Sequence, residues 1–117
     1  MDASIRDLEK QVQLFCEERD WDQFHNPKDL AIGISTEANE LLDLFRFKSN
    51  DEMIQLFADL EKKQKVEDEI ADVLFFILRF AQMNQIDLVS ALKNKIEKNA
   101  LKYPVEKAKG SNRKYNE

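Results

Sequence analysis

STEANELLDLF, residues 35–45, has the composition of an amphipathic helix but carries a charge on its apolar face. Ile34, Leu41 and Leu44 recur at the spacing of one helix face, and Glu37 falls on that same face. An ionised carboxylate that faces neighbouring helices is strongly disfavoured unless a cation or a hydrogen-bond donor compensates it. The nature of the compensating group therefore decides what this helix does.

A second apolar face, in EDEIADVLFFILRFA (residues 67–81), repeats the arrangement. Glu69 lies on this face, and Asp72 follows it by three positions. In the helix that contains residues 35–45, Glu40 follows Glu37 by the same three positions. Residues three apart on a helix project to nearly the same side, so each helix presents a pair of carboxylates. If the two helices pack through these faces, four carboxylates converge in a partly dry space.

Four converging carboxylates raise one another's pKa and require positive charge nearby. Neither apolar face contains a Lys or Arg, so a divalent cation is the better candidate. Oxygen ligands alone suit Mg²⁺, Ca²⁺ or Mn²⁺, whereas Zn²⁺ prefers His or Cys. Mg²⁺ completes its coordination shell with waters and substrate phosphates, which indicates phosphate-ester or phosphoanhydride chemistry. The alternative is two solvated acidic faces without a metal, and the pattern by itself leaves both open.

The composition limits the fold class and the partners. The chain has 117 residues with two Gly and two Pro, which favours a single all-helical domain. Its single Cys cannot form an internal disulfide, and no apolar run approaches the roughly 20 residues of a membrane helix. The N-terminus lacks the apolar core of a secretory signal, so we expect a cytoplasmic protein with no membrane partner. The net charge of −5 argues against nucleic acid as a partner, although residues 93–117 hold eight Lys or Arg and three acids.

The apolar periodicity predicts four long helices and one short helix, with ranges of about 4–19, 27–46, 65–83 and 88–103 for the long ones. Asn26 is expected to cap the second helix, with Pro27 at its first position, and Asp51 to cap the short helix. Residues 61–65 either link the short helix to the next one or belong to the latter. We therefore expect an antiparallel four-helix bundle with an additional short helix in residues 1–104, followed by a polar, irregular tail at 105–117.

The motifs resemble those of the MazG-like all-α nucleoside triphosphate pyrophosphohydrolases, whose signature is two acidic pairs, Glu-x-x-Glu and Glu-x-x-Asp. Within that family, the dCTP pyrophosphatase branch is the most similar. The resemblance extends in order over ERDWDQFHNPKDL (17–29), EANELLDLFRFK (37–48), EDEIADVLFFILRFA (67–81), KYP (102–104) and SNRKYNE (111–117). It therefore covers nearly the whole chain.

The resemblance implies a reaction in which dCTP, or a modified dCTP, and water give dCMP and pyrophosphate, which cleanses the nucleotide pool. It implies that Mg²⁺, with Mn²⁺ as a substitute, is held by four residues that are thereby also catalytic: Glu37, Glu40, Glu69 and Asp72. It further implies a homo-oligomer in which dimers pair into tetramers. Eight Phe and long apolar faces exceed what one small bundle buries, which agrees with association.

By the same resemblance, a nucleoside pocket uses three residues of the loop before the second helix, Trp21, Gln23 and His25. It also uses Phe47, which follows the second helix, and Phe76, which is one helical turn beyond Asp72. An amide such as Asn99 would read the polar edge of the base. Lys95, Lys98 and Lys102 share one side of the last helix with Asn99. Lys95 and Lys102 are candidates for phosphate contact, with Tyr103 assisting them, whereas Lys98 is expected to be solvated. An ordinary core position for Phe76 and a solvated lysine face are the structural alternatives.

Three other functions can be weighed against this one. Phe47 and Phe76 stand where animal members of the branch have Trp and Tyr, so a broad-specificity or dUTP-preferring enzyme is the alternative within the class. A di-iron carboxylate bundle requires Glu-x-x-His pairs, and the chain's one His, His25, lies in a loop. A structural helical interaction module is the non-enzyme alternative, and it predicts that replacing Glu37 by Gln stabilises the fold without loss of any activity.

Overall fold

The computed structural model describes residues 3–113, and this part of the chain contains helices but no strand. The order is α1 (Ile5–Glu18), the 3₁₀ turn η1 (Asp22–Phe24), α2 (Pro27–Asp43), α3 (Asn50–Ala58), α4 (Leu60–Met83), α5 (Leu88–Lys102) and α6 (Val105–Ala108). The prediction of an all-α fold is confirmed. The chain divides after Gln85 into two compact units.

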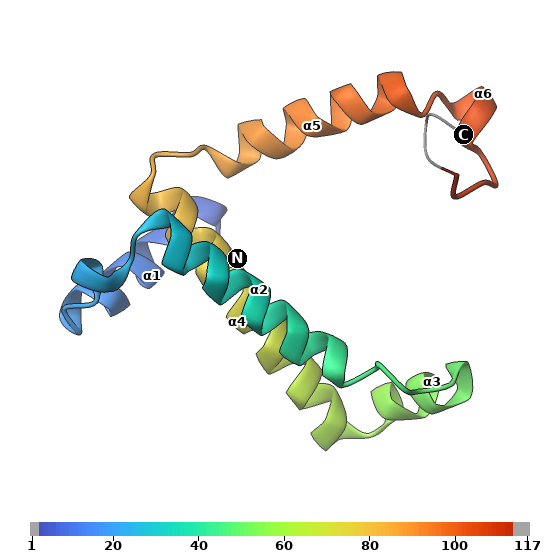
Figure 1. Cartoon of the computed structure of the whole chain (residues 1–117), viewed down its shortest axis with the longest axis horizontal. Helices are drawn as coiled ribbons and strands as arrows, with labels where there is room; N and C mark the ends of the chain where they lie inside the picture. Colours follow the sequence, from blue (N-terminus) through green and yellow to red (C-terminus); the bar gives the residue numbers. More distant parts are fainter. Residues whose placement is uncertain (1–2, 114–117) are drawn as a thin grey trace. The chain divides into compact units, whose positions relative to one another are not determined.

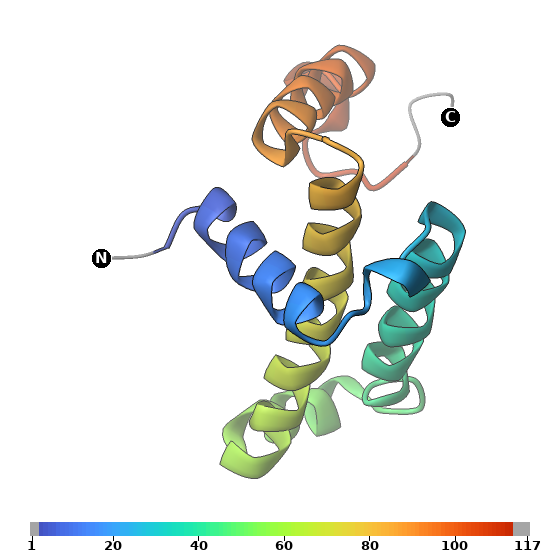
Figure 2. The same ribbon diagram turned by 90° about the vertical axis from the view of Figure 1, so that its left-hand side faces the viewer.

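Helix α4 is the scaffold of the first unit. It runs antiparallel to α2 along most of that helix, and these two make the most extensive contact in the unit (Figure 1). α1 crosses α4 (Figure 2), and α3 also packs against α4. Because every other helix of the unit touches α4, the side chains of α4 decide which parts of the sequence come together.

Side-chain caps fix the starts of the first two helices where the sequence predicts them. The Ser4 hydroxyl accepts a hydrogen bond from the Asp7 N–H at 3.1 Å, and the Asp7 carboxylate accepts one from the Ser4 N–H at 3.1 Å. Asn26 Oδ1 accepts from the Asp29 N–H at 2.8 Å, and Pro27 occupies the first helical position. The predicted start of α2 is therefore confirmed.

The cap of the short helix α3 differs from the prediction, which placed it at Asp51. The Ser49 hydroxyl accepts from the Glu52 N–H at 3.2 Å, and Glu52 Oε1 accepts from the Ser49 N–H at 3.2 Å. Asp51 lies inside the first turn, where its charge complements the helix dipole. The sequence Ser-x-x-Glu is a capping box, and it outcompetes a single Asp because it satisfies two N–H groups.

Helix α4 begins five residues before the predicted Lys65, at Leu60. Asp59 Oδ1 accepts from the N–H groups of Glu61 at 3.0 Å and Lys62 at 3.2 Å, which starts the helix at that point. Residues 61–65 therefore belong to α4. At the other boundary, α2 ends at Asp43, and residues 44–47 form turns in place of the predicted last helical turn.

The buried apolar side chains of the described residues are few, and they are Cys16, Leu30, Leu56, Val66, Leu78 and Ala81. Leu30 precedes Ile34 by four residues, and Val66 precedes Glu69 by three, so each continues one of the two apolar faces predicted from the sequence. Their burial shows that those faces pack inward. Within residues 3–113 no single helix is both long and apolar enough to cross a membrane; only α4 and α5 counted together, with the break between them, reach that length and composition.

In the second unit, α5 starts and ends as predicted. Asp87 Oδ1 accepts from the Ser90 N–H at 3.1 Å, and the helix stops at Lys102, two residues before Pro104. Its apolar side chains are exposed, with Leu92 at 63% and Ile96 at 57%. The tail predicted to be irregular contains one further turn of helix, α6, and the rest of the tail beyond residue 113 lies outside the described residues.

Candidate metal centre

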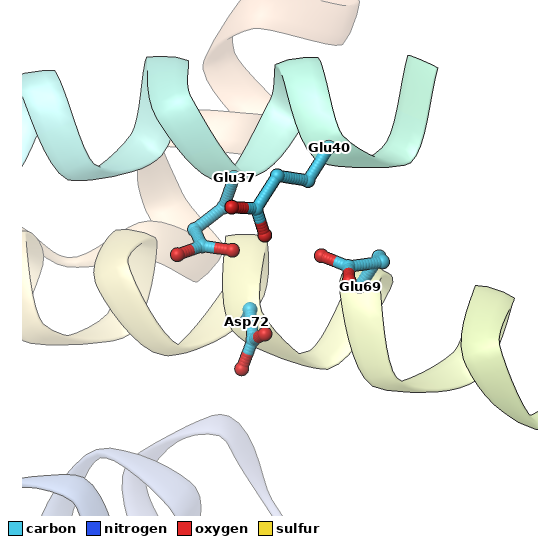
Figure 3. Close-up of side chains that lie close together, drawn as sticks. All are labelled: Glu37, Glu40, Glu69 and Asp72. Carbon is cyan, nitrogen blue, oxygen red and sulfur yellow. The ribbon is translucent and has the colours of Figure 1, made fainter. Parts of the chain in front are cut away.

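Four carboxylates from α2 and α4 converge in the first unit (Figure 3). Glu37 and Glu40 come from α2, and Glu69 and Asp72 come from the facing side of α4. One oxygen from each lies within 4.8 Å of the others. The three-residue spacing puts each pair on one side of its helix, and the antiparallel packing of α2 on α4 turns the two pairs toward each other.

The two glutamates that lie on the apolar faces are half-buried, whereas Glu40 and Asp72 are exposed. The Oε2 atoms of Glu37 and Glu69 are both buried without a hydrogen-bond partner. Burial raises the pKa of Glu37 to about 7, helped by hydrogen bonding to Glu40 and by repulsion from the other three carboxylates. Burial and Glu40 raise the pKa of Glu69 as well. Neither of the two ion pairs found in residues 3–113 involves this cluster.

The donor set fits a hard divalent cation. Oxygen ligands on opposite sides of Mg²⁺ or Ca²⁺ lie about 4–5 Å apart, twice the metal–oxygen distance, and the four carboxylates already fall within this range. The two buried oxygens without partners are the atoms that a cation would satisfy. With oxygen donors alone, the cluster suits Mg²⁺, Mn²⁺ or Ca²⁺ better than Zn²⁺.

The loop between α1 and α2 holds three of the residues predicted for the nucleoside pocket. The Trp21 ring, 38% exposed, lies edge-to-face with the rings of Phe15 at 5.6 Å and His25 at 6.2 Å. Gln23 Nε2 donates to the backbone carbonyl of Asp20 at 3.0 Å, so its amide group stabilises the loop. Trp21 and His25 thus form one aromatic group at the N-terminal end of α2.

Phe76 is half-buried and lies one helical turn after Asp72 on α4. A Cβ built on Gly33 of α2 would lie 2.7 Å from two atoms of the Phe76 ring, closer than real contacts allow. The ring therefore fills the space that the missing side chain of Gly33 leaves. Gly33 precedes Glu37 by four residues, so Phe76 is in the packing layer directly beside the acidic cluster.

Comparison with known proteins identifies the family. The sequence model of the MazG-like family matches residues 32–117. This chain belongs to the MazG-like family. dCTP pyrophosphatase 1 of Homo sapiens is 31% identical to the MazG-like chain over 116 residues, which are 99% of this chain and 68% of the human protein. The Mus musculus protein of the same name is 32% identical over 114 residues, 97% of this chain and 67% of the mouse protein.

A solved structure agrees with this assignment. The crystal structure of a pyrophosphatase from Archaeoglobus fulgidus DSM 4304 superposes on this MazG-like chain with a TM-score of 0.80 at 37% sequence identity. The match covers 89% of this chain and 95% of the archaeal one. The likeness therefore extends over most of both chains.

The predicted aromatic contacts of the MazG-like chain do not all come together within it. Trp21 and His25 precede α2, whereas Phe47 follows it, and a helix of 17 residues spans about 25 Å. Phe47 is 87% exposed, and its ring contacts the guanidinium of Arg46 at 5.1 Å. A single chain thus places Phe47 and Trp21 at opposite ends of α2.

The residues predicted to contact phosphate, and Asn99, which was predicted to read the base, lie in the second unit. Lys95, Asn99 and Lys102 are exposed on α5, and Tyr103 follows its last residue, donating its N–H to the Asn99 carbonyl at 2.8 Å. The acidic cluster belongs to the first unit. A role for these four residues at the site therefore stays a prediction.

Sequence reasoning missed three lysine side chains near the acidic cluster. A cavity of about 340 Å³ in the first unit is lined by three lysines, Lys48, Lys62 and Lys65, and by two carboxylates, Asp43 and Glu52, among others. Lys65 precedes Glu69 by four residues on α4, which places the cavity about one helical turn from the cluster. The four-residue spacing of Lys65 and Glu69 could have placed Lys65 near the cluster. Lys62 could not be placed in the same way, because that requires α4 to begin at Leu60.

Proposed function

We propose that the protein is a Mg²⁺-dependent nucleoside triphosphate pyrophosphohydrolase that converts dCTP, or a modified dCTP, to dCMP and pyrophosphate. One observation carries the proposal: four carboxylates on two packed helices meet within 4.8 Å with two buried oxygens left without partners. Relatives named dCTP pyrophosphatase 1 support the class of reaction and the substrate. Mn²⁺ is the expected substitute for Mg²⁺.

Glu37, Glu40, Glu69 and Asp72 would hold the metal. When bound, the metal neutralises phosphate charge, polarises the α-phosphoryl group and lowers the pKa of a coordinated water. The exposed members, Glu40 and Asp72, are open to the incoming phosphate chain, whereas the half-buried members are held by the packing of α2 on α4. Fixed carboxylates need no rearrangement as the reaction proceeds, which lowers the barrier.

The remaining phosphate charge requires positive side chains. Lys48, Lys62 and Lys65 line the cavity one turn from the cluster, and they are the candidates in the first unit for the β- and γ-phosphates. Lys95 and Lys102 are the candidates in the second unit, with Tyr103 beside them. Replacing Lys65 by Met should raise KM for the triphosphate more than it lowers kcat if this lysine contacts the substrate.

The aromatic groups support a nucleoside pocket. Trp21 and His25 form one face of it, and Phe76, next to the acidic cluster, is the candidate for a second contact with the base. Asn99 would read the polar edge of the base. Phe carries no polar atom, so Phe47 and Phe76 favour stacking over hydrogen-bonded discrimination. That observation supports the second candidate, a broad-specificity or dUTP-preferring enzyme.

We further propose a homo-oligomer, dimer or tetramer. Leu92 and Ile96 on α5 are more than half exposed, as are Ile32 on α2 and Ile54 on α3. Leu92 and Ile96 are four residues apart on one side of α5, and an exposed apolar stripe of this kind is typical of a surface that is buried by association. A second copy would also let Phe47 of one chain meet the Trp21 loop of another, which one chain alone does not achieve. Sedimentation velocity would test this directly.

The decisive experiment measures pyrophosphate release from dCTP, dUTP, dTTP, dATP, dGTP and the ribonucleotides with Mg²⁺. Glu40→Gln and Asp72→Asn should abolish release while the helical circular dichroism is unchanged. Glu67→Gln is the matched control, because Glu67 is exposed on α4 and projects to the side opposite Glu69. Folded protein that releases no pyrophosphate from any nucleotide would instead favour a structural helical module.

A further inference from the structure

Arg79 is the one buried charged side chain among the described residues, with 1% of its surface exposed. It lies near the C-terminal end of α4, and each of its three guanidinium nitrogens has a hydrogen-bond partner. Nε donates to Nδ1 of His25 at 2.9 Å, Nη1 donates to Oε1 of Gln82 at 2.6 Å, and Nη2 pairs with the Asp22 carboxylate. Two of these partners, Asp22 and His25, come from the loop between α1 and α2.

The bond from Arg79 decides where the proton of His25 sits. An arginine is always protonated and can only donate, so Nδ1 of His25 must be the acceptor and carry no proton. A neutral imidazole has one N–H, which in this arrangement is on Nε2. Adding a proton at Nδ1 would break the bond and place a second positive charge against Arg79.

The charged groups that face His25 act in opposite directions. Burial and Arg79 of α4 lower the pKa of His25, whereas Asp22 of η1 raises it. The Asp22 carboxylate is paired with the Arg79 guanidinium, and this positive charge weakens the stabilisation that Asp22 would give to a protonated imidazole. The hydrogen-bond geometry and the surrounding charges therefore favour the same state, a neutral ring with its proton on Nε2.

We propose that Arg79 is a positioning residue for substrate recognition, which holds His25 as a neutral imidazole that presents its Nε2–H donor to an acceptor atom of the nucleotide. The inference rests on the proposed function for the identity of the ligand. The acceptor is an oxygen or ring nitrogen of the base or a phosphate oxygen. A donor at this point binds an acceptor atom and disfavours an amino group.

The same contacts couple His25 to Trp21. The two rings lie edge-to-face at 6.2 Å, and Trp21 in turn lies against Phe15. Because Arg79 binds both Asp22, the first residue of η1, and His25, which follows its last residue, it attaches the whole aromatic group to α4. Loss of the guanidinium should therefore release the donor and the aromatic face together.

His25 is the chain's one histidine, so NMR can follow it without assignment problems. Long-range ¹H–¹⁵N correlation spectra distinguish an unprotonated from a protonated ring nitrogen. They would be recorded on the ¹⁵N-labelled full chain, without nucleotide, between pH 5 and 8. The expected result is a single tautomer with Nδ1 bare and Nε2 protonated, and a titration midpoint below the ordinary value of 6.5. In Arg79→Met, both tautomers should be populated and the midpoint should rise.

The kinetic test compares Arg79→Met with Arg6→Met, an exposed arginine of α1. KM for dCTP should rise about tenfold in Arg79→Met, the loss expected for one hydrogen bond to the substrate, with a much smaller change in kcat. A larger effect on pyrimidine than on purine nucleotides would place the acceptor on the base, and an equal effect on all would place it on phosphate. Arg6→Met should leave both constants unchanged.

Distinct results separate this inference from the proposed function. A wild-type His25 with its proton on Nδ1, or with two tautomers, would overturn the inference, as would folded Arg79→Met with unchanged KM. If Arg79→Met does not fold, Arg79→Lys keeps a positive charge beside Asp22 but lacks the guanidinium fork, and the same tautomer mixture and KM increase are expected. A wild-type protein with the single Nε2–H tautomer and no hydrolysis of any nucleotide would contradict the proposed function and its part in this inference, while the state of His25 would stand.

Discussion

Glu37 on α2 and Glu69 on α4 each have a buried carboxylate oxygen, Oε2, that lacks a hydrogen-bond partner. Both residues belong to a cluster of four carboxylates whose ligand atoms lie within 4.8 Å of one another. For the protein alone this arrangement is unfavourable, because like charges repel strongly where water is scarce. A divalent cation removes the repulsion and satisfies both oxygens. The packing of α2 on α4 thus forms a site that favours the binding of a cation.

The first prediction concerns the pH dependence of stability without metal. The pKa of Glu37 is about 7 in the folded protein and 4.5 for the ordinary side chain. Since the folded state holds this proton more tightly, the stabilisation is complete below pH 4.5 and is lost as the pH rises through 7. Thermal unfolding from pH 4 to 8 with a chelator should show this loss in the wild type relative to Glu37→Gln. Parallel profiles for the two proteins would show that Glu37 does not titrate in this range.

Metal should reverse that loss. Ligand at 100 times its dissociation constant adds about 2.7 kcal/mol to the free energy of unfolding. We expect Mg²⁺ to stabilise the wild type and the Glu67→Gln control equally at pH 8, and Asp72→Asn much less. Differential scanning calorimetry with increasing Mg²⁺ measures this. Equal shifts in all three proteins would place the ion elsewhere on the surface.

The third prediction tests the start of α3. Ser49→Ala should lower the free energy of unfolding by about 1 kcal/mol, because it removes the hydroxyl that accepts from the Glu52 N–H. Asp51→Ala should cost only a few tenths of a kcal/mol, the usual size of a helix-dipole effect at an exposed site. Urea titrations of both variants give the comparison. An equal or larger cost at Asp51 would restore the cap predicted from the sequence.

The fourth prediction tests the contact between Gly33 and Phe76. Gly33→Ala should destabilise the protein, because overpacking costs about 1–3 kcal/mol whereas the gain in helix propensity is about 1 kcal/mol at most. Phe76→Leu should relieve the clash, so the double variant should lose less than the sum of the two single variants. Chemical denaturation of the four proteins closes the cycle. A stabilised Gly33→Ala would mean that the ring moves without cost.

Much of the architecture follows from local sequence signals. Asn26-Pro27 fixes the start of α2, and Pro104 lies just past the end of α5, because caps and proline act within a few residues. The early start of α4 was missed because Asp59 follows an apolar run without a visible break, so only its hydrogen bonds mark the boundary. The same locality explains the acidic pairs, whose convergence needs only helical spacing and antiparallel packing.

The rest of the site depends on tertiary contacts that spacing cannot give. Arg79 lies one position before the apolar residue Phe80, and nothing in the neighbouring sequence indicates that its side chain is buried. Its burial depends on hydrogen bonds to Asp22 and His25. These partners are 57 and 54 residues away in the chain, so the local sequence does not reveal them. Phe47 illustrates the opposite case, since the family resemblance placed it in the nucleoside pocket with Trp21, but within one chain the length of α2 separates the two.

The central claim is that these four carboxylates hold a divalent cation that a nucleotide completes. Crystals grown with Mn²⁺ and a non-hydrolysable dCTP analogue test it most directly, because the anomalous signal of Mn²⁺ locates the ion without reference to its ligands. We predict a peak between Glu37, Glu40, Glu69 and Asp72, with a phosphate oxygen in contact with the same ion. Clear density for the analogue with no anomalous peak among these side chains would contradict the account.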